Sequence, residues 1–127
     1  MFKRTIIASA VLLATSSVWA ASANNQATVA QTGNNNLATV EQIDSSNHNQ
    51  ASISQIGADN EAKTIQKNTS QSEASVAQVG AGNDALVTQE SSTAGSVAQV
   101  ASTGNFNVAT VTQQVFNERS EERRVGK

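Results

Sequence analysis

Glutamine and asparagine are the residues of this 127-residue chain whose type and spacing could do chemistry. Glutamine recurs in two series with a period of about 23 residues, and asparagine recurs in a third. A primary amide both donates and accepts, so identical amides stacked above one another bond as a ladder, which offsets the cost of burying them. The predicted ladders are Gln31, Gln55, Gln78 and Gln99; Gln42, Gln66, Gln89 and Gln113; and Asn36, Asn60, Asn83 and Asn107.

Other reactive side chains are sparse. His48 is the only histidine and falls in a turn between the first two repeats, where a solvated surface role is the ordinary one. The chain has no cysteine, which excludes disulfides and thiolate metal sites. No pair of acids recurs at a fixed spacing, and no phosphate-binding loop occurs. We therefore expect no catalytic residue, no metal site and no cofactor.

The amides lie in strands. The chain has four units of two halves, each half a variation on polar-x-Ala-x-Val-x-Gln, and a period of two places the matched side chains on one face of a strand. The half with Thr64 and Ile65 matches least well, since its apolar residue has moved one place. The predicted inward core is Val29, Ile53, Val76 and Val97 in the first halves and Val40, Val87 and Val111 in the second.

Glycines separate the two halves of each unit. Gly33, Gly57 and Gly80 stand where the chain must turn, and glycine adopts positive φ at little cost. In the fourth unit the corresponding segment, residues 100–106, reads as three residues longer, with its glycine displaced. Each unit is therefore predicted to be strand–turn–strand.

The repeat predicts an all-β, amyloid-like β-solenoid of four strand–turn–strand rungs, which form two facing parallel sheets. Successive rungs are expected to lie about 4.8 Å apart along the stack. The units are residues 25–48, 49–71, 72–92 and 93–113. A short stack exposes unpaired strand edges at both ends, and another copy would cover them. We therefore expect self-assembly into a fibre.

The two ends of the chain differ from the repeats. Residues 1–20 read as a signal peptide, with Lys3 and Arg4 before the apolar stretch Ile6 to Leu13, and cleavage is possible up to residue 23. No transmembrane segment is expected after its removal. Residues 119–127 equal the translation of a common sequencing adapter, so we expect the natural sequence to be lost after about Glu118, with residues 114–118 as its last segment; a genuine basic tail is the alternative.

The segment between these ends is acidic. It holds two lysines and eight acids, a formal charge of −6, which disfavours nucleic-acid binding. Its charges fall at turns or outward positions. Such charges ordinarily keep a protein soluble. A more specific hypothesis is that they act as gatekeepers, which slow premature assembly. The gatekeeper candidates are Asp59, Glu61 and Asp84.

Units beginning at Asn25, Asn49 and Ser72 satisfy (Ser/Asn/Thr)-x5-Gln-x-Gly-x2-Asn-x-Ala-x3-Gln. Over residues 25–113 this pattern resembles the curlin repeat of bacterial curli subunits. The resemblance implies an extracellular amyloid fibre of the biofilm matrix that serves adhesion. It also implies periplasmic chaperones, export through the outer-membrane curli secretion pore, and nucleation by a partner curlin. Two features depart from the family: the repeats begin without an evident export-targeting segment, and there are four units where major subunits often have five.

Two alternatives remain open. A minor nucleator curlin would tend to be more basic late in the chain, so the acidic composition favours a major subunit. A monomeric solenoid that binds ice or carbohydrate needs a regular outward array. One outward column reads Thr28, Ser52, Ser75 and Ser96, whereas the opposite sheet reads Thr39, Lys63, Leu86 and Thr110, which is irregular.

Overall fold

The computed structural model describes residues 11–12, 15–20, 24–43, 48–90, 95–114 and 120–125. The expected signal peptide lies partly outside this range, as do its possible cleavage positions at residues 21–23. Most of the expected end of the natural sequence, residues 115–118, also lies outside it.

The described strands form two parallel sheets. One sheet contains β1 (Val11–Leu12), β3 (Gln26–Asn34), β5 (Gln50–Ala58), β7 (Glu73–Ala81), β9 (Val97–Thr103) and β11 (Ser120–Val125), in that order. The other has the order β10 (Val108–Gln114), β8 (Asp84–Glu90), β6 (Glu61–Lys67), β4 (Leu37–Ile43) and β2 (Thr15–Ala20).

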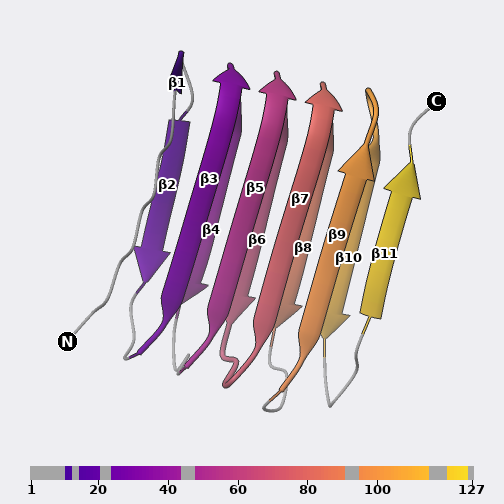
Figure 1. The fold of residues 1–127 in the computed structure, drawn as a ribbon. Helices are drawn as coiled ribbons and strands as arrows, with labels where there is room; N and C mark the ends of the chain where they lie inside the picture. The colour runs from indigo at the N-terminus through magenta and orange to yellow at the C-terminus, as the bar shows by residue number, and fades with distance from the viewer. Residues whose placement is uncertain are drawn as a thin grey trace.

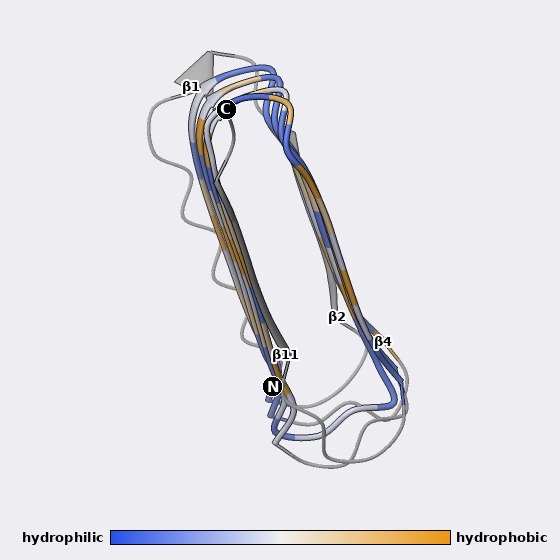
Figure 2. Ribbon diagram, turned by 90° about the vertical axis from the view of Figure 1, so that its right-hand side faces the viewer, coloured by the Kyte–Doolittle hydropathy of each residue, from blue (hydrophilic) through white to orange (hydrophobic). Residues whose placement is uncertain are grey.

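Successive repeats stack as rungs of a β-solenoid, which confirms the predicted fold class. Each strand pairs in parallel with its counterpart one repeat away, so that β3 pairs with β5 and β4 with β6. Figure 1 shows the two layers, with the strands of one running opposite to those of the other. Viewed along the stack in Figure 2, the chain traces a flattened loop with one sheet on each long side.

Alternation along the strands places one face of each sheet inside the loop. The pattern of burial in β4, β6 and β8 is strictly alternating, as the period of two predicts. The interior is narrow because its apolar side chains are small, alanine and valine with one isoleucine. The buried apolar side chains are Ala27, Val29, Ala38, Val40, Ala51, Ile53, Ala62, Ala74, Val76, Ala85, Val87, Ala98, Val100, Ala109 and Val111.

The register predicted for the fourth rung is wrong. Val76 stands opposite Val100, and Ser75 stands opposite Gln99, so Val97 is not the inward valine of this rung. Val100 is buried and Val97 is only half-buried. The rung begins at Ser96 rather than at residue 93, because Ser96-x-Ala98-x-Val100 continues the inward columns.

With this register, the fourth turn has no insertion. Gly104 stacks on Gly80, as Gly80 stacks on Gly57 and Gly57 on Gly33. The apparent extra length came from aligning the rung on Gln99, three residues before the true equivalent of Gln78, which is Ser102.

The stacked glycines leave no room for a side chain. A Cβ on Gly57 would lie 1.9 Å from the carbonyl oxygen of Gly80, and Gly57 has φ of +125°. The same distance separates a Cβ on Gly33 from the Gly57 oxygen. The glycine column therefore serves both the turn and the close approach of neighbouring rungs.

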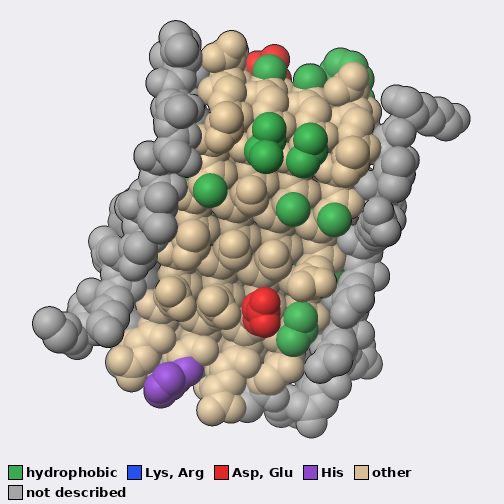
Figure 3. Space-filling model, viewed as in Figure 1, with side chains coloured by type: hydrophobic (Ala, Val, Ile, Leu, Met, Phe, Trp, Pro, Cys, Tyr) green, Lys and Arg blue, Asp and Glu red, His purple; other side chains and the backbone are tan. Residues whose placement is uncertain are grey.

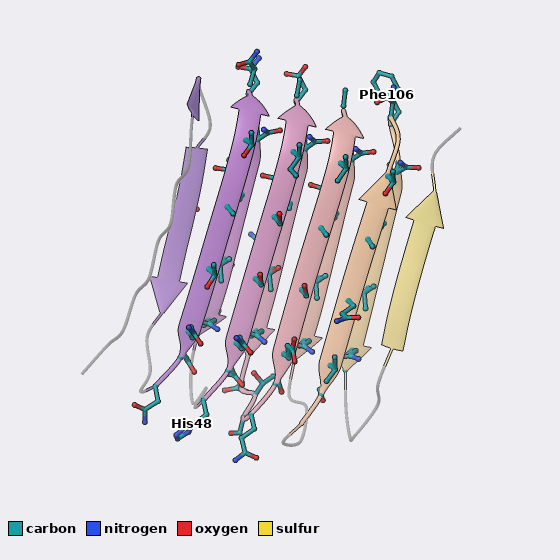
Figure 4. The ribbon with its side chains drawn as sticks, in the orientation of Figure 1. His48 and Phe106 are labelled. Carbon is teal, nitrogen blue, oxygen red and sulfur yellow. The ribbon has the colours of Figure 1, made fainter. Side chains whose placement is uncertain are left out.

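Two further turn positions in each rung adopt left-handed backbone. One comes directly before the first buried polar residue of a rung and is occupied by Asn24, His48, Gln71 and Gly95. The other precedes the buried asparagine and is occupied by Asn35, Asp59, Gly82 and Phe106. Figure 4 shows His48 and Phe106 at opposite ends of the strands, on the two turn edges of the solenoid.

Candidate functional site

The glutamines of β4, β6, β8 and β10 form one continuous amide column. Gln42 Nε2 donates to Gln66 Oε1 at 2.9 Å, Gln66 Nε2 to Gln89 Oε1 at 2.9 Å, and Gln89 Nε2 to Gln113 Oε1 at 2.8 Å. Each Nε2 also donates to a backbone oxygen across the interior, as Gln66 does to the Gln50 oxygen at 3.2 Å. These second bonds fix which end of each amide carries the nitrogen.

The column of the opposite sheet has the same geometry but stops one rung earlier. Gln31 Nε2 donates to Gln55 Oε1 at 2.8 Å, and Gln55 Nε2 donates to Gln78 Oε1 at 2.9 Å. The next residue is Ser102, whose hydroxyl is too short to continue the ladder and has no hydrogen-bond partner in the described part of the chain. The assignment of Gln99 to this column is wrong, because Gln99 points outward and is exposed.

The asparagine column runs through all four rungs in the opposite sense. Asn60 Nδ2 donates to Asn36 Oδ1 at 3.0 Å, Asn83 Nδ2 to Asn60 Oδ1 at 3.0 Å, and Asn107 Nδ2 to Asn83 Oδ1 at 2.9 Å. Each Oδ1 also accepts the backbone N–H of the asparagine one rung later, as Asn36 does from Asn60 at 3.2 Å. Glutamine amides thus donate toward the C-terminal rung, and asparagine amides donate toward the N-terminal rung.

A fourth polar column was not singled out from the sequence. Asn25, Asn49, Ser72 and Ser96 are buried at the start of the odd-numbered strands. Asn25 Oδ1 accepts the N–H of Asn49 at 3.0 Å, and Asn49 Oδ1 accepts the N–H of Ser72 at 2.9 Å. The signal for this column was the recurring polar residue at the first position of each half-unit.

Four buried polar atoms lack a hydrogen-bond partner among the described residues: Gln42 Oε1, Thr64 Oγ1, Thr69 Oγ1 and Ser102 Oγ. Two of them mark places where a column changes residue type. Thr64 stands between Val40 and Val87, and Ser102 follows Gln78. The third, Gln42 Oε1, lies at the N-terminal end of its column, where Ala20 of β2 stands opposite Gln42 and offers no amide.

The outward hydroxyl column considered for a surface-binding solenoid is shorter than predicted. Thr28, Ser52 and Ser75 are in register, but the fourth member is Gln99. Ser96 is buried, with 2% of its surface exposed, and cannot extend an outward array. The structure therefore lacks the regular outward array of hydroxyls that a monomeric surface-binding solenoid would need.

The charged side chains lie outside the interior. The gatekeeper candidates Asp59, Glu61 and Asp84 are turn or strand-start residues, Asp59 and Glu61 are exposed, and Glu61 stands in register with Asp84. Like charges opposite each other in a sheet repel. Two ion pairs link neighbouring rungs: Lys63 Nζ lies 2.8 Å from Glu41 Oε1, and Lys67 Nζ lies 3.6 Å from Glu90 Oε1.

Two other kinds of site were sought within the described ranges. No group of three or more histidines, cysteines or acids is placed to hold a metal ion. No helix in that part of the chain is long and apolar enough to cross a membrane.

The comparisons with known proteins agree with the repeat. The family model of the curlin associated repeat matches residues 23–43, which hold β3, β4 and the turn between them. Neither the curated proteins nor the solved structures yielded a match. The matched segment carries Asn25, Gln31, Gly33, Asn36 and Gln42, one member of each polar or glycine column described above. The chain thus carries a curlin associated repeat, and this is consistent with the curlin family.

Proposed function

We propose that this chain is the structural subunit of an extracellular curli-type amyloid fibre, and that the fibre grows as copies add to the end rungs. Assembly, rather than catalysis, is its activity. The observation that carries the proposal is the unpartnered Oε1 of Gln42 at one end of an otherwise continuous amide column, where β2, within the expected signal peptide, lies beside β4 without supplying a donor. Removal of residues 1–20 opens this edge of β4 to another copy, and the donor of that copy avoids the cost of about 1–3 kcal/mol that an unpaired acceptor would carry once the junction buries it.

The other end of the same column supplies the complementary group. Gln113 is the last member, and the glutamines before it each donate Nε2 to the next rung. A second copy stacked in the same polarity puts its Gln42 Oε1 where the next acceptor belongs. The asparagine columns join at the same junction, with Asn107 Oδ1 accepting from Asn36 of the added copy in place of the Thr32 oxygen to which Asn36 Nδ2 donates in the single copy. Strand β10 ends its sheet among the described strands, so its outer edge is open to that copy, whereas in the other sheet β3 of the added copy takes the place of β11 beside β9.

Location and partners follow from the curlin repeat. We infer that the chain crosses the periplasm with chaperones, leaves through the outer-membrane curli secretion pore and joins a fibre of the biofilm matrix that serves adhesion. A partner curlin nucleates it. The acidic composition of residues 21–118 favours the major subunit over the minor nucleator.

Asp59, Glu61 and Asp84 act in this proposal as gatekeepers. The stacked pair Glu61 and Asp84 places two carboxylates on neighbouring rungs, which penalises each rung as it forms. Replacing all three acids by asparagine should shorten the lag before fibres grow. An unchanged lag would leave them a solubility role alone.

Growth of residues 21–127 from purified monomer tests the proposed function. We expect thioflavin-T fluorescence to rise after a lag, unbranched filaments in electron micrographs, and fibre reflections at about 4.8 Å and about 10 Å. A stable monomer that neither grows nor binds the dye would overturn the proposal and favour a monomeric surface-binding solenoid.

A further inference from the structure

The two outer faces of the solenoid differ in charge. We call the outward side chains of β3, β5, β7 and β9 the odd face, and those of β4, β6, β8 and β10 the even face. The odd face has a single ionisable side chain, Glu73, among its strand residues. Figure 3 shows this face almost entirely as uncharged polar and small apolar side chains, with no lysine or arginine on its described part.

The even face carries most of the strand charge. Its charged residues are Glu41, Glu61, Lys63, Lys67, Asp84 and Glu90. Four carboxylates and two ammonium groups leave it net negative, and the two ion pairs cancel only part of the field. Bringing two even faces together would desolvate these charges and oppose like with like, which costs free energy.

Side chains of similar size form rows along the stack on the odd face. A row of small side chains consists of Ala30, Ser54, Ala77 and Ala101. Beside it runs a row of larger ones, Thr32, Ile56, Val79 and Thr103. Ile56 and Val79 are exposed by 49% and 45%, an apolar surface that the single solenoid leaves in water.

We propose that the odd face is the surface by which two stacks of this chain pair laterally, each copy facing a second copy. This inference rests on the proposed fibre. A two-fold axis parallel to the fibre and placed between the two rows sets the larger row of each stack against the small row of the other. The contact is then self-complementary and repeats at every rung, as in a dry interface between amyloid sheets.

The area of the face explains why pairing needs a fibre. Strands of about nine residues at about 3.3 Å each, four rungs deep at about 4.8 Å, give roughly 570 Å² per copy. Stable complexes bury about 800 Å² per partner, so two single copies fall short. Two stacked copies already exceed that area, and every further copy adds to it. Lateral pairing therefore follows stacking.

A second copy suits this face better than an unrelated partner does. Its rows recur at the rung spacing, and another stack of this chain carries the same spacing with matching row heights along its whole length. A partner of different period would lose register within a few rungs.

Filaments of the full chain test the proposal by their mass per length. The double variant Ser54→Lys with Ala77→Lys places two charges in the small row of rungs two and three. Its matched control, Ile65→Lys with Thr88→Lys, places the same two charges on the even face of the same rungs, at positions that are also in register. We expect paired filaments from the wild type and the control, and filaments of half that mass per length from the odd-face variant.

A milder variant covers the case in which stacked lysines stop growth. Ile56→Thr with Val79→Thr gives the larger row the residue it already has in rungs one and four, and should shift filaments from paired to single. Odd-face variants that stay paired, or wild-type filaments that are single, would overturn the proposal while leaving the proposed fibre intact. Single wild-type filaments that bundle only with a neutral β-glucan would also overturn it and assign the face to polysaccharide. Absence of any wild-type filament would instead overturn the proposed function.

Discussion

The glutamine columns of the two sheets differ at one residue. In the sheet of β4, β6, β8 and β10 every rung has glutamine, and each amide is bonded to the next. In the opposite sheet Ser102 takes the fourth place, and its hydroxyl is buried without a partner. A ladder tolerates buried amides because each member satisfies its neighbours. The stability of a column therefore depends on its uniformity more than on any one bond.

The valine columns of the two sheets also differ at one residue, but here a polar residue interrupts an apolar column. Thr64 interrupts the column that contains Val40, Val87 and Val111, and its hydroxyl is also buried without a partner. Each sheet thus holds one departure from its repeat, a serine among amides and a threonine among valines. The variants below complete or interrupt these columns.

Gly57→Ala should have the largest effect. The new Cβ would lie 1.9 Å from the Gly80 oxygen at a φ of +125°, so the turn and the rung spacing would both have to change. We expect a loss of more than about 3 kcal/mol in the free energy of unfolding of the stack, and no filament growth. Gly95→Ala is the control, because it also has positive φ but nothing lies within 4 Å. Equal loss in both variants would show that close approach of the glycines contributes nothing.

Gln66→Leu should have the next largest effect. It leaves Gln89 Oε1 without its donor and two backbone oxygens without the Gln66 amide, at a cost of about 2–3 kcal/mol. Gln78→Leu, at the end of the interrupted column, removes one donor from a backbone oxygen and one acceptor, and should cost less. Denaturant midpoints of preformed filaments measure the difference. A greater loss of stability in Gln78→Leu than in Gln66→Leu would contradict the claim that the stability of a column depends on its uniformity.

Thr64→Val should stabilise the stack by about 1–2 kcal/mol. It removes a buried hydroxyl that has no partner and restores an apolar residue to the column, with little change in volume. Thr88→Val on the outward face of β8 is the matched control and should change stability by less than about 0.5 kcal/mol. The same denaturation measurement applies, and a destabilised Thr64→Val would mean that the hydroxyl has a role in the stack.

Ser102→Gln should have the smallest effect, a gain of about 0.5–1.5 kcal/mol. The longer side chain can accept from Gln78 and extend the column through the fourth rung, as Gln113 does in the other sheet. Filaments of this variant should dissolve at a higher denaturant concentration than the wild type. No change would indicate that the fourth rung gains nothing from a complete column.

The sequence was sufficient for the class of fold and for most of the columns, because a period of two and a repeat of near-constant length fix which residues share a face. It failed in the fourth rung, where Gln99 supplied a glutamine close to the expected place. The residue that aligns is Ser102, and only the pairing of β7 with β9 identifies it. An alignment on Gly104 and Asn107 would have given the right register. The difference between the two outer faces needs both sheets in place, so no single repeat could indicate it.

Cross-linking across the junction between copies tests the central claim most directly. The chain has no cysteine, so Thr39→Cys with Thr110→Cys introduces one thiol on the outer surface of the first rung and one on the fourth. Within a copy these positions are three rungs apart, about 14 Å, but in a fibre of in-register columns Thr110 lies one rung, about 4.8 Å, from Thr39 of the next copy. We predict that a thiol-specific linker spanning about 8 Å converts filaments of the double variant into long covalent multimers and leaves each single variant monomeric. Monomers from the double variant, or dimers from either single variant, would contradict head-to-tail stacking of the rungs.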